Sequence, residues 1–237
     1  MRVAALIPAY QAAAHLGEVI LRLRALPAPP DILVVDDGSR DATAEVARQL
    51  GARVLCFAGN RGKGNALLAG FEALRGDCDA VVTLDADGQH PPECLPDFVR
   101  AAEAGADLVL GRRERTPNMP WERRFANDFS SRWTAMLAGQ TVSDSQCGYR
   151  LHRSALLART PISPGRYELE TEIIVRAARL GFRIAEVPIP TVYANEESHM
   201  RKTRDVPRIV GSLLRLGFEG VAPPPEMRRA RAGGGGR

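Results

Sequence analysis

The sequence predicts an α/β fold, in which a mostly parallel β-sheet is covered by helices on both faces. Short apolar, β-branched runs alternate with segments of helical spacing along the first half of the chain. Polar clusters directly follow three of those runs, as expected where parallel strands end at one edge of a sheet. With 237 residues, 45% of them hydrophobic, the chain is long enough for one large domain.

The expected elements follow from these apolar patterns and from Pro and Gly positions. Strands are expected at 3–7, 32–35, 53–57, 80–84 and 107–110 in the first half, and at 183–187 and just after 150 in the second. Helices are expected at 15–25, 42–50, 65–74, 91–103, 123–137, 169–180 and 206–216. Pro8 is expected to stop the first strand, and Asp41 to cap the second helix. We take residues 1–220 as a single domain and 221–237, rich in Pro, Gly and Arg, as a disordered tail.

Composition excludes several classes of protein. The net charge is +4, but four Arg of the tail face one acid there, so the remaining chain is nearly neutral. A nucleic-acid-binding protein should instead show a basic face within its fold. The four Cys are scattered, which favours reduced thiols over a disulfide framework or a zinc site. No signal-peptide pattern opens the chain and no run approaches about 20 apolar residues. We therefore expect a cytoplasmic protein that meets any membrane only at its cytosolic surface.

An acidic motif is the strongest chemical signal in the sequence. Asp85 and Asp87 follow the apolar run 80–84, and alternate side chains of an extended chain point the same way. Gln89 lies on the same period, and Gly88 allows the backbone to bend. Oxygen ligands in this arrangement suit Mg²⁺ or Mn²⁺, which take further ligands from substrate phosphates. The alternative is an ordinary turn, in which Asp and Gly are common.

Further polar clusters follow neighbouring strands or open helices. Asp36 and Asp37 can recognise a base or ribose through charge-assisted hydrogen bonds, or can simply form a turn. Lys63, between two glycines at a helix start, can bind phosphate, although a glycine-rich turn explains the same residues. An arginine-rich stretch at 112–124 can bind phosphate through one or two of its members, or can form a solvated face.

Taken together, the motifs resemble those of family 2 glycosyltransferases with a GT-A fold, within the dolichyl-phosphate mannose synthase-like branch. The resemblance runs from Val3 to about Leu216. It rests on an ordered set of motifs: Ile7-Pro8-Ala9-Tyr10, Asp36-Asp37-Gly38-Ser39, Asn60-Arg61-Gly62-Lys63-Gly64, Asp85-Ala86-Asp87-Gly88-Gln89-His90, Gly111-Arg112-Arg113, Asp144-Ser145-Gln146-Cys147-Gly148-Tyr149 and Tyr167-Glu168-Leu169-Glu170-Thr171-Glu172. It implies a GT-A type, mixed but mostly parallel sheet in a single domain.

The resemblance also implies roles for individual residues. The nucleotide-sugar site would comprise Pro8, Ala9, Tyr10, Asp37, Lys63, Asp85 and Ala86. A divalent ion, Mg²⁺ or Mn²⁺, would be held by Asp85, Asp87 and Gln89. The acceptor phosphate would meet Arg113, Arg123, Arg124, Ser198 and Arg201. The residues expected to carry catalysis are Asp87, Arg113 and Arg124. Two residues depart from those common in the branch. His199 stands where Lys is common, and Gln11 stands where Asn or Glu is usual.

The implied activity is inverting transfer of a hexose from a nucleotide-diphosphate sugar, of the GDP-mannose or UDP-glucose type. Polyprenyl or dolichyl phosphate is the favoured acceptor, because the stretch 144–146 lacks the Glu-Asp pair that relatives acting on alcohols use as a base. One alternative is transfer to a saccharide or small-molecule hydroxyl, and another is a non-catalytic nucleotide-sugar-binding protein. A haloacid-dehalogenase-type phosphatase and a sugar-1-phosphate nucleotidyltransferase fit the motifs less well. The donor base, the sugar and the oligomeric state stay open.

Overall fold

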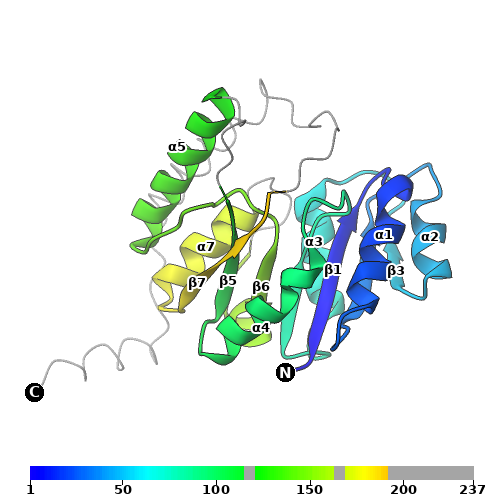
Figure 1. Ribbon diagram of the computed structural model, residues 1–237, viewed down its shortest axis with the longest axis horizontal. Coiled ribbons are helices and arrows are strands. Elements are labelled where there is room, and N and C mark those ends of the chain that lie inside the picture. The colour runs from blue at the N-terminus through cyan, green and yellow to red at the C-terminus, as the bar shows by residue number, and fades with distance from the viewer. Residues whose placement is uncertain (115–120, 163–168, 192–237) are drawn as a thin grey trace, which may run out of the picture.

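The protein is built around one seven-stranded sheet with helices on both faces (Figure 1). The computed structural model describes residues 1–114, 121–162 and 169–191, and leaves the side chains of 121–126 outside the description. The strands are β1 (Val3–Ala9), β2 (Asp31–Asp36), β3 (Arg53–Cys56), β4 (Ala80–Thr83), β5 (Leu108–Arg113), β6 (Arg150–Arg153) and β7 (Ile184–Ile189). The α-helices are α1 (Ala13–Arg24), α2 (Thr43–Gln49), α3 (Lys63–Ala73), α4 (Leu95–Glu103), α5 (Trp121–Ala138), α6 (Ser154–Arg159) and α7 (Leu169–Arg179). A 3-10 turn, η1 (Pro92–Cys94), precedes α4.

The strand order is β3-β2-β1-β4-β6-β5-β7, and β6 alone runs antiparallel to its neighbours among the described strands. The pairs β1 with β2, β1 with β4, β2 with β3 and β5 with β7 are all parallel. The predicted mixed, mostly parallel sheet is therefore confirmed.

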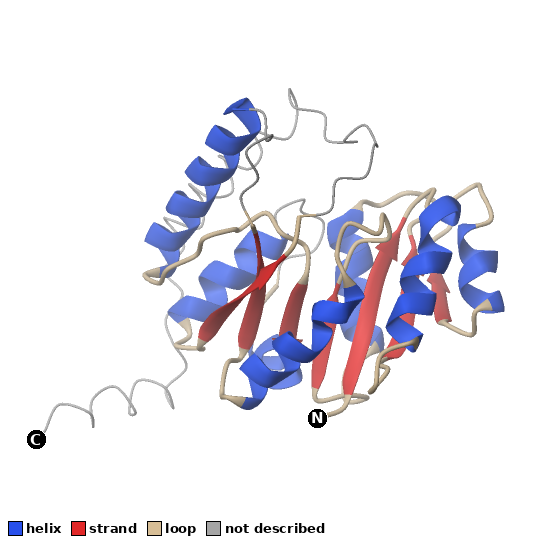
Figure 2. Ribbon diagram, viewed as in Figure 1, coloured by secondary structure: helices blue, strands red, loops and turns tan. Residues whose placement is uncertain are grey.

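Helices lie against both faces of the sheet (Figure 2). Each face buries its own core of apolar side chains. On β1, Ala5 and Ile7 face the core shared with α1, α2 and α4, whereas Ala4 and Leu6 face the core shared with α3, α6 and α7. This period of two is what an extended strand imposes, and it explains why both faces of the strand are apolar. Because both faces are covered, ligands can reach the sheet only at its edges and strand ends.

Pro8 and Pro188 lie inside strands β1 and β7. The sequence predicted instead that these strands would end at residues 7 and 187, just before each proline. Leu6 and Pro8 direct their backbone groups toward β4, but the β1–β4 register ends at Leu6 and Thr83. The N–H that Pro8 lacks would therefore have met no ladder partner, and β1 continues to Ala9 beside β2. Pro188 lies in β7, an edge strand of the described sheet, where one side of the backbone is also unpaired.

Other differences are local. β5 continues through Arg113, beyond its expected end at residue 110, because it pairs with β7 as far as Ile189. The N-cap of α2 is Ala42 rather than Asp41, although the Asp41 carboxylate accepts the Thr43 backbone N–H at 3.1 Å. Helix α6 was not predicted. The expected helix at 206–216 and the tail lie outside the described residues. No helix in the described part of the chain is long and apolar enough to cross a membrane.

A candidate active site at the carboxyl edge of the sheet

The acidic motif lies directly beyond the carboxyl end of β4, and His90 fixes its backbone. The Asp85 N–H donates to His90 Nδ1 at 3.0 Å, so this nitrogen is an acceptor. Burial lowers the pKa of His90, which keeps the ring neutral. Its ring stacks on Tyr149 at a centroid distance of 5.5 Å. Sequence reasoning did not assign His90 this role, and the only signal for it was its place at the end of the turn formed by Gly88.

Asp85 is paired with Lys63, the first residue of α3. Lys63 Nζ lies 2.7 Å from Asp85 Oδ1 and 3.4 Å from Glu170 Oε1 at the start of α7. Burial by itself disfavours both charged forms, but the charges of the partners outweigh it: they raise the pKa of Lys63 and hold the pKa of Asp85 at about 2. The ammonium thus neutralises one acid of the motif in this structure.

Gly148 permits this pairing because it has no side chain. A Cβ at Gly148 would lie 2.9 Å from Lys63 Nζ and 3.0 Å from Asp85 Oδ2. The loop before β6 therefore passes against the ion pair itself. The sequence pointed to Gly148 only as part of a motif, without this contact.

Asp87 is the acid of the motif that lacks a cationic partner in the described structure. Its Oδ1 accepts the Gln89 backbone N–H at 2.9 Å. Burial and the nearby charge of Asp85 raise its pKa. Two acids that disfavour each other's charge, in a setting of oxygen donors, fit a divalent cation chemically. No group of three or more His, Cys, Asp and Glu gathers around a metal position among the described residues. Mg²⁺ in proteins commonly keeps water and takes further ligands from substrate phosphates.

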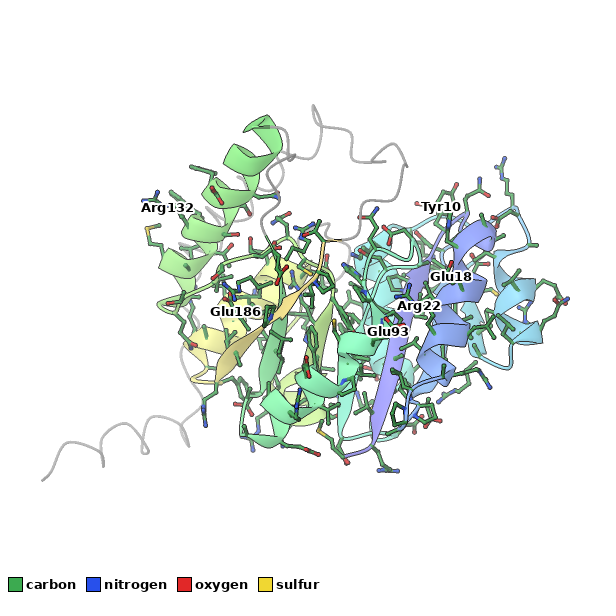
Figure 3. All side chains as sticks on the ribbon, viewed as in Figure 1. Tyr10, Glu18, Arg22, Glu93, Arg132 and Glu186 are labelled. Carbon is green, nitrogen blue, oxygen red and sulfur yellow. The ribbon has the colours of Figure 1, made fainter. Side chains whose placement is uncertain are left out.

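Residues beyond β1 and β2 form the neighbouring part of the edge. Ala9 ends β1, and Tyr10 after it is 49% exposed (Figure 3). Gln11 has a φ of 54°, an uncommon value for a residue other than glycine. The Asp37 carboxylate accepts the backbone N–H groups of Arg61 and Gly62 at 2.6 and 2.8 Å. Asp37 thereby ties the end of β2 to the loop that leads into Lys63.

Arg113, at the end of β5, is held in a fork by Asp144. Arg113 Nε and Nη2 donate to the two carboxylate oxygens at 2.7 and 3.0 Å. Asp144 also accepts the Gln146 N–H at 3.1 Å. Burial would raise the pKa of Asp144, but its hydrogen bonds to Arg113 and the charge of that residue lower it overall. The sequence predicted that Arg113 binds a substrate group; it did not predict Asp144 as its protein partner.

The loop 144–149 is fixed by a buried arginine that sequence reasoning had not selected. Arg150 is 1% exposed, and its guanidinium donates to the carbonyl oxygens of Ser145, Cys147 and Glu170. One cation therefore connects β6, the loop and α7. Buried polar groups of this kind are stable only when fully hydrogen-bonded, so the loop and the start of α7 hold each other in place.

The structure thus brings several predicted residues together and leaves others untested. Lys63, Asp85 and Asp87 lie in one cluster, and the charge of Asp85 also acts on Arg113. Pro8, Ala9, Tyr10 and Asp37 lie at the ends of the adjacent strands. Ala86 is buried within the acidic motif, and Gln89 contacts Asp87 through its backbone N–H. The side chains of Arg123 and Arg124, and residues Ser198 and Arg201, lie outside the description.

We predict that Gly148→Ala displaces the Lys63–Asp85 pair while leaving the fold intact. The new methyl group would meet the ends of two flexible side chains rather than backbone, so the loss of unfolding free energy should stay below about 1 kcal/mol. Once its contact with Asp85 is displaced, Lys63 should react faster with an amine-acylating reagent, as followed by peptide mass spectrometry. Unchanged reactivity of Lys63 in a folded variant would contradict the assigned contact.

We also predict a pH-dependent contribution from Asp144. Its folded pKa lies below the ordinary value near 4, so the stabilisation is present above that value and is lost as the pH falls through the folded pKa. Asp144→Asn should lower the unfolding free energy by about 1–3 kcal/mol at pH 7, with a smaller difference below pH 4, as measured by urea unfolding. As a control, Asp97→Asn removes the exposed pair with Arg100 and should cost about 0–1 kcal/mol. A difference for Asp144 that stays constant on acidification would exclude this account.

The chain is similar in sequence to a known protein family and to several of its members. Residues 4–162 match the model of the glycosyl transferase family 2. The undecaprenyl-phosphate mannosyltransferase of Micrococcus luteus is 34% identical over 98% of this chain and 100% of its own length. The polyprenol monophosphomannose synthase of Mycolicibacterium smegmatis is 33% identical, covering 79% of this chain and 76% of its own.

Solved structures show the same fold. Glucosyl-3-phosphoglycerate synthase from Mycobacterium tuberculosis, in complex with Mn²⁺, UDP and glucosyl-3-phosphoglycerate, aligns with a TM-score of 0.73 at 22% identity, covering 91% of this chain and 79% of that one. The predicted GT-A fold and the resemblance to the dolichyl-phosphate mannose synthase-like branch are thus confirmed. The chain belongs to glycosyl transferase family 2.

Proposed function

We propose that this glycosyltransferase transfers a hexose, with inversion, from a nucleotide-diphosphate sugar to a polyprenyl phosphate. The donor would be of the GDP-mannose or UDP-glucose type. Relatives named as undecaprenyl-phosphate and polyprenol-phosphate mannose transferases support the acceptor class. The proposal goes beyond those names because the geometry around Arg113 favours an acceptor that is already ionised.

The observation that carries the proposal is that Asp144 is already hydrogen-bonded to Arg113 and Gln146. A hydroxyl acceptor needs a general base within reach of its proton. Asp144 is the carboxylate at Arg113, but it accepts four N–H groups and has a lowered pKa. A carboxylate occupied in this way is a poor base. A phosphate monoester is anionic near neutral pH and needs only to be positioned, which is the task that a guanidinium performs well.

The other carboxylates of this cluster in the described part of the chain also have partners, present or proposed. Asp85 and Glu170 both lie at the Lys63 ammonium. Asp87 forms no ion pair within the residues that the structure describes, and we assign it, with Asp85 and Gln89, to the divalent ion. None of these groups is then available to deprotonate an alcohol.

On the donor side, the residues present fit Mg²⁺ or Mn²⁺ as described above. When bound, such an ion would neutralise the leaving diphosphate as a Lewis acid. Lys63 forms an ion pair with Asp85 in this structure. With Asp85 bound to the ion, the Lys63 ammonium would be free to contact the diphosphate. Pro8, Ala9, Tyr10 and Asp37 would border the nucleotide. Arg113, with Arg123 or Arg124, Ser198 and Arg201, would hold the acceptor phosphate on the opposite face of the sugar.

The proposed acceptor carries a lipid chain, so the enzyme would work at a membrane surface. We infer a cytoplasmic protein that contacts the cytosolic face of a membrane while it turns over. This localisation follows from the proposed acceptor.

The test is an incubation with Mn²⁺ and a panel of labelled GDP- and UDP-sugars, with and without polyprenyl phosphate. Labelled lipid should form with one donor. Asp87→Asn should reduce the rate at least about 100-fold, because the loss of a metal ligand removes several kcal/mol of transition-state stabilisation. As a matched control, Asp31→Asn alters an exposed acid at the other end of β2 and should leave the rate unchanged. Nucleotide-sugar binding without transfer to any acceptor would instead favour a non-catalytic binding protein.

A further inference from the structure

His90 is buried beside the acidic motif, and both of its ring nitrogens face protein groups. Its Nδ1 accepts the Asp85 backbone N–H at 3.0 Å, and its Nε2 lies 3.9 Å from the sulfur of Cys147. In a neutral imidazole one nitrogen accepts and the other carries the proton. Because Nδ1 accepts, the proton is on Nε2 and is directed to Cys147. Both nitrogens are thus occupied, so His90 does not act as a metal ligand itself.

Ring stacking holds His90 in this orientation. The His90 ring stacks on Tyr149 at a centroid distance of 5.5 Å, and Tyr149 stacks on Phe98 of α4 at 4.4 Å. Tyr149 is fully buried, and its hydroxyl donates to the Pro92 carbonyl at 3.4 Å. A column of three rings therefore connects the core beneath α4 with the acidic motif. The column fixes the plane of the His90 ring, which keeps Nδ1 directed at the Asp85 N–H.

Side chains close the turn that carries the two acids. Gly88 has a φ of 76°, a left-handed value that lets the backbone reverse there. The Gln89 N–H donates to Asp87 Oδ1 at 2.9 Å, while the Asp85 N–H donates to His90. The bond to His90 joins the first residue of the turn to the last. It therefore fixes the direction in which the Asp85 side chain leaves the backbone.

His90 also connects the two halves of the site. Its partners Cys147 and Tyr149 belong to the loop that carries Asp144, the carboxylate that aligns Arg113. Cys147 is 1% exposed, so this contact is shielded from water. One buried ring thus contacts both the acidic motif and the loop behind Arg113. Movement of this ring would shift the two acids relative to Arg113.

We propose that His90 is a positioning residue for the divalent ion. It holds the backbone of Asp85 so that the carboxylates of Asp85 and Asp87 face the same cation. This inference rests on the proposed function, because it takes both acids as ligands of the ion. Groups behind metal ligands commonly orient them, and their loss typically lowers metal affinity or activity about 10–100-fold. His90 acts in this way through a backbone N–H rather than through the side chain of a ligand.

Two substitutions separate this role from ring packing. His90→Asn keeps an acceptor at the position of Nδ1 but removes the ring, whereas His90→Phe keeps a ring against Tyr149 but removes the acceptor. Mn²⁺ affinity in the presence of GDP or UDP, measured by electron paramagnetic resonance, should stay within about threefold of the wild type for His90→Asn and fall at least about tenfold for His90→Phe. Ring packing alone predicts the opposite order. Equal losses, or that opposite order, would overturn the proposal.

Hydrogen exchange tests the same bond without metal. The Asp85 amide should exchange slowly in the wild type and in His90→Asn, and at least about tenfold faster in His90→Phe, because its acceptor is lost. His90→Gln, whose amide reaches the position of Nε2 rather than that of Nδ1, replaces His90→Phe if thermal unfolding shows that the Phe variant is not folded. An unchanged Asp85 exchange rate in a folded variant without the acceptor would contradict the assigned role.

Transfer assays distinguish this inference from the proposed function. If Mn²⁺ affinity follows the expected order but the wild type transfers sugar to no acceptor, the proposed function fails and the positioning role stands. If the wild type transfers sugar to polyprenyl phosphate but both variants bind Mn²⁺ equally, the positioning role fails and the proposed function stands. A wild type that binds no Mn²⁺ with either nucleotide would overturn the metal assignment and the positioning role together.

Discussion

The insertion of β6 between β4 and β5 is the constraint on which the site depends. Because β6 is antiparallel to both neighbours, it enters the sheet at the edge where the parallel strands end. Its first residue, Arg150, pairs with Thr83 on one side and with Leu110 on the other. The preceding loop is therefore laid across the carboxyl edge, between the acidic motif and Arg113. The buried Arg150 guanidinium then holds that loop through three carbonyl oxygens.

This arrangement separates two electrostatic environments within one site. On the β4 side, Asp85 and Asp87 form an acid pair that Lys63 neutralises in part. On the β5 side, the Asp144 carboxylate aligns Arg113. The charge of Arg113 in turn lowers the pKa of Asp144 and keeps it ionised. Gly148 allows the loop between them to approach the ion pair. A sugar held between a metal-bound diphosphate and an arginine-bound anion would fit this division, with leaving group and nucleophile on opposite sides.

The sequence was informative where a local pattern determines the outcome. Alternating apolar runs predicted the parallel strands, and the spacing of Asp85 and Asp87 predicted their place beyond β4. The antiparallel β6 could not be read in this way, because strand direction within a sheet depends on partners distant in the sequence. The prediction that Pro8 ends the first strand was wrong for a related reason. A proline in a strand is unfavourable only where a neighbouring strand needs its missing N–H, and β4 no longer pairs with β1 beside Pro8. The ion pairs Lys63–Asp85 and Arg113–Asp144 join residues far apart in the chain, so no local sequence pattern predicts them.

The central claim is that the enzyme needs an anionic acceptor, because its nearest carboxylate positions Arg113 instead of acting as a base. The most direct test compares two acceptors of identical chain length, a polyprenyl phosphate and the corresponding polyprenol, with the same labelled donor and Mn²⁺. The account predicts sugar transfer to the phosphate and none to the alcohol. Transfer to the alcohol at a comparable rate would show that a general base operates in the site and would contradict the account.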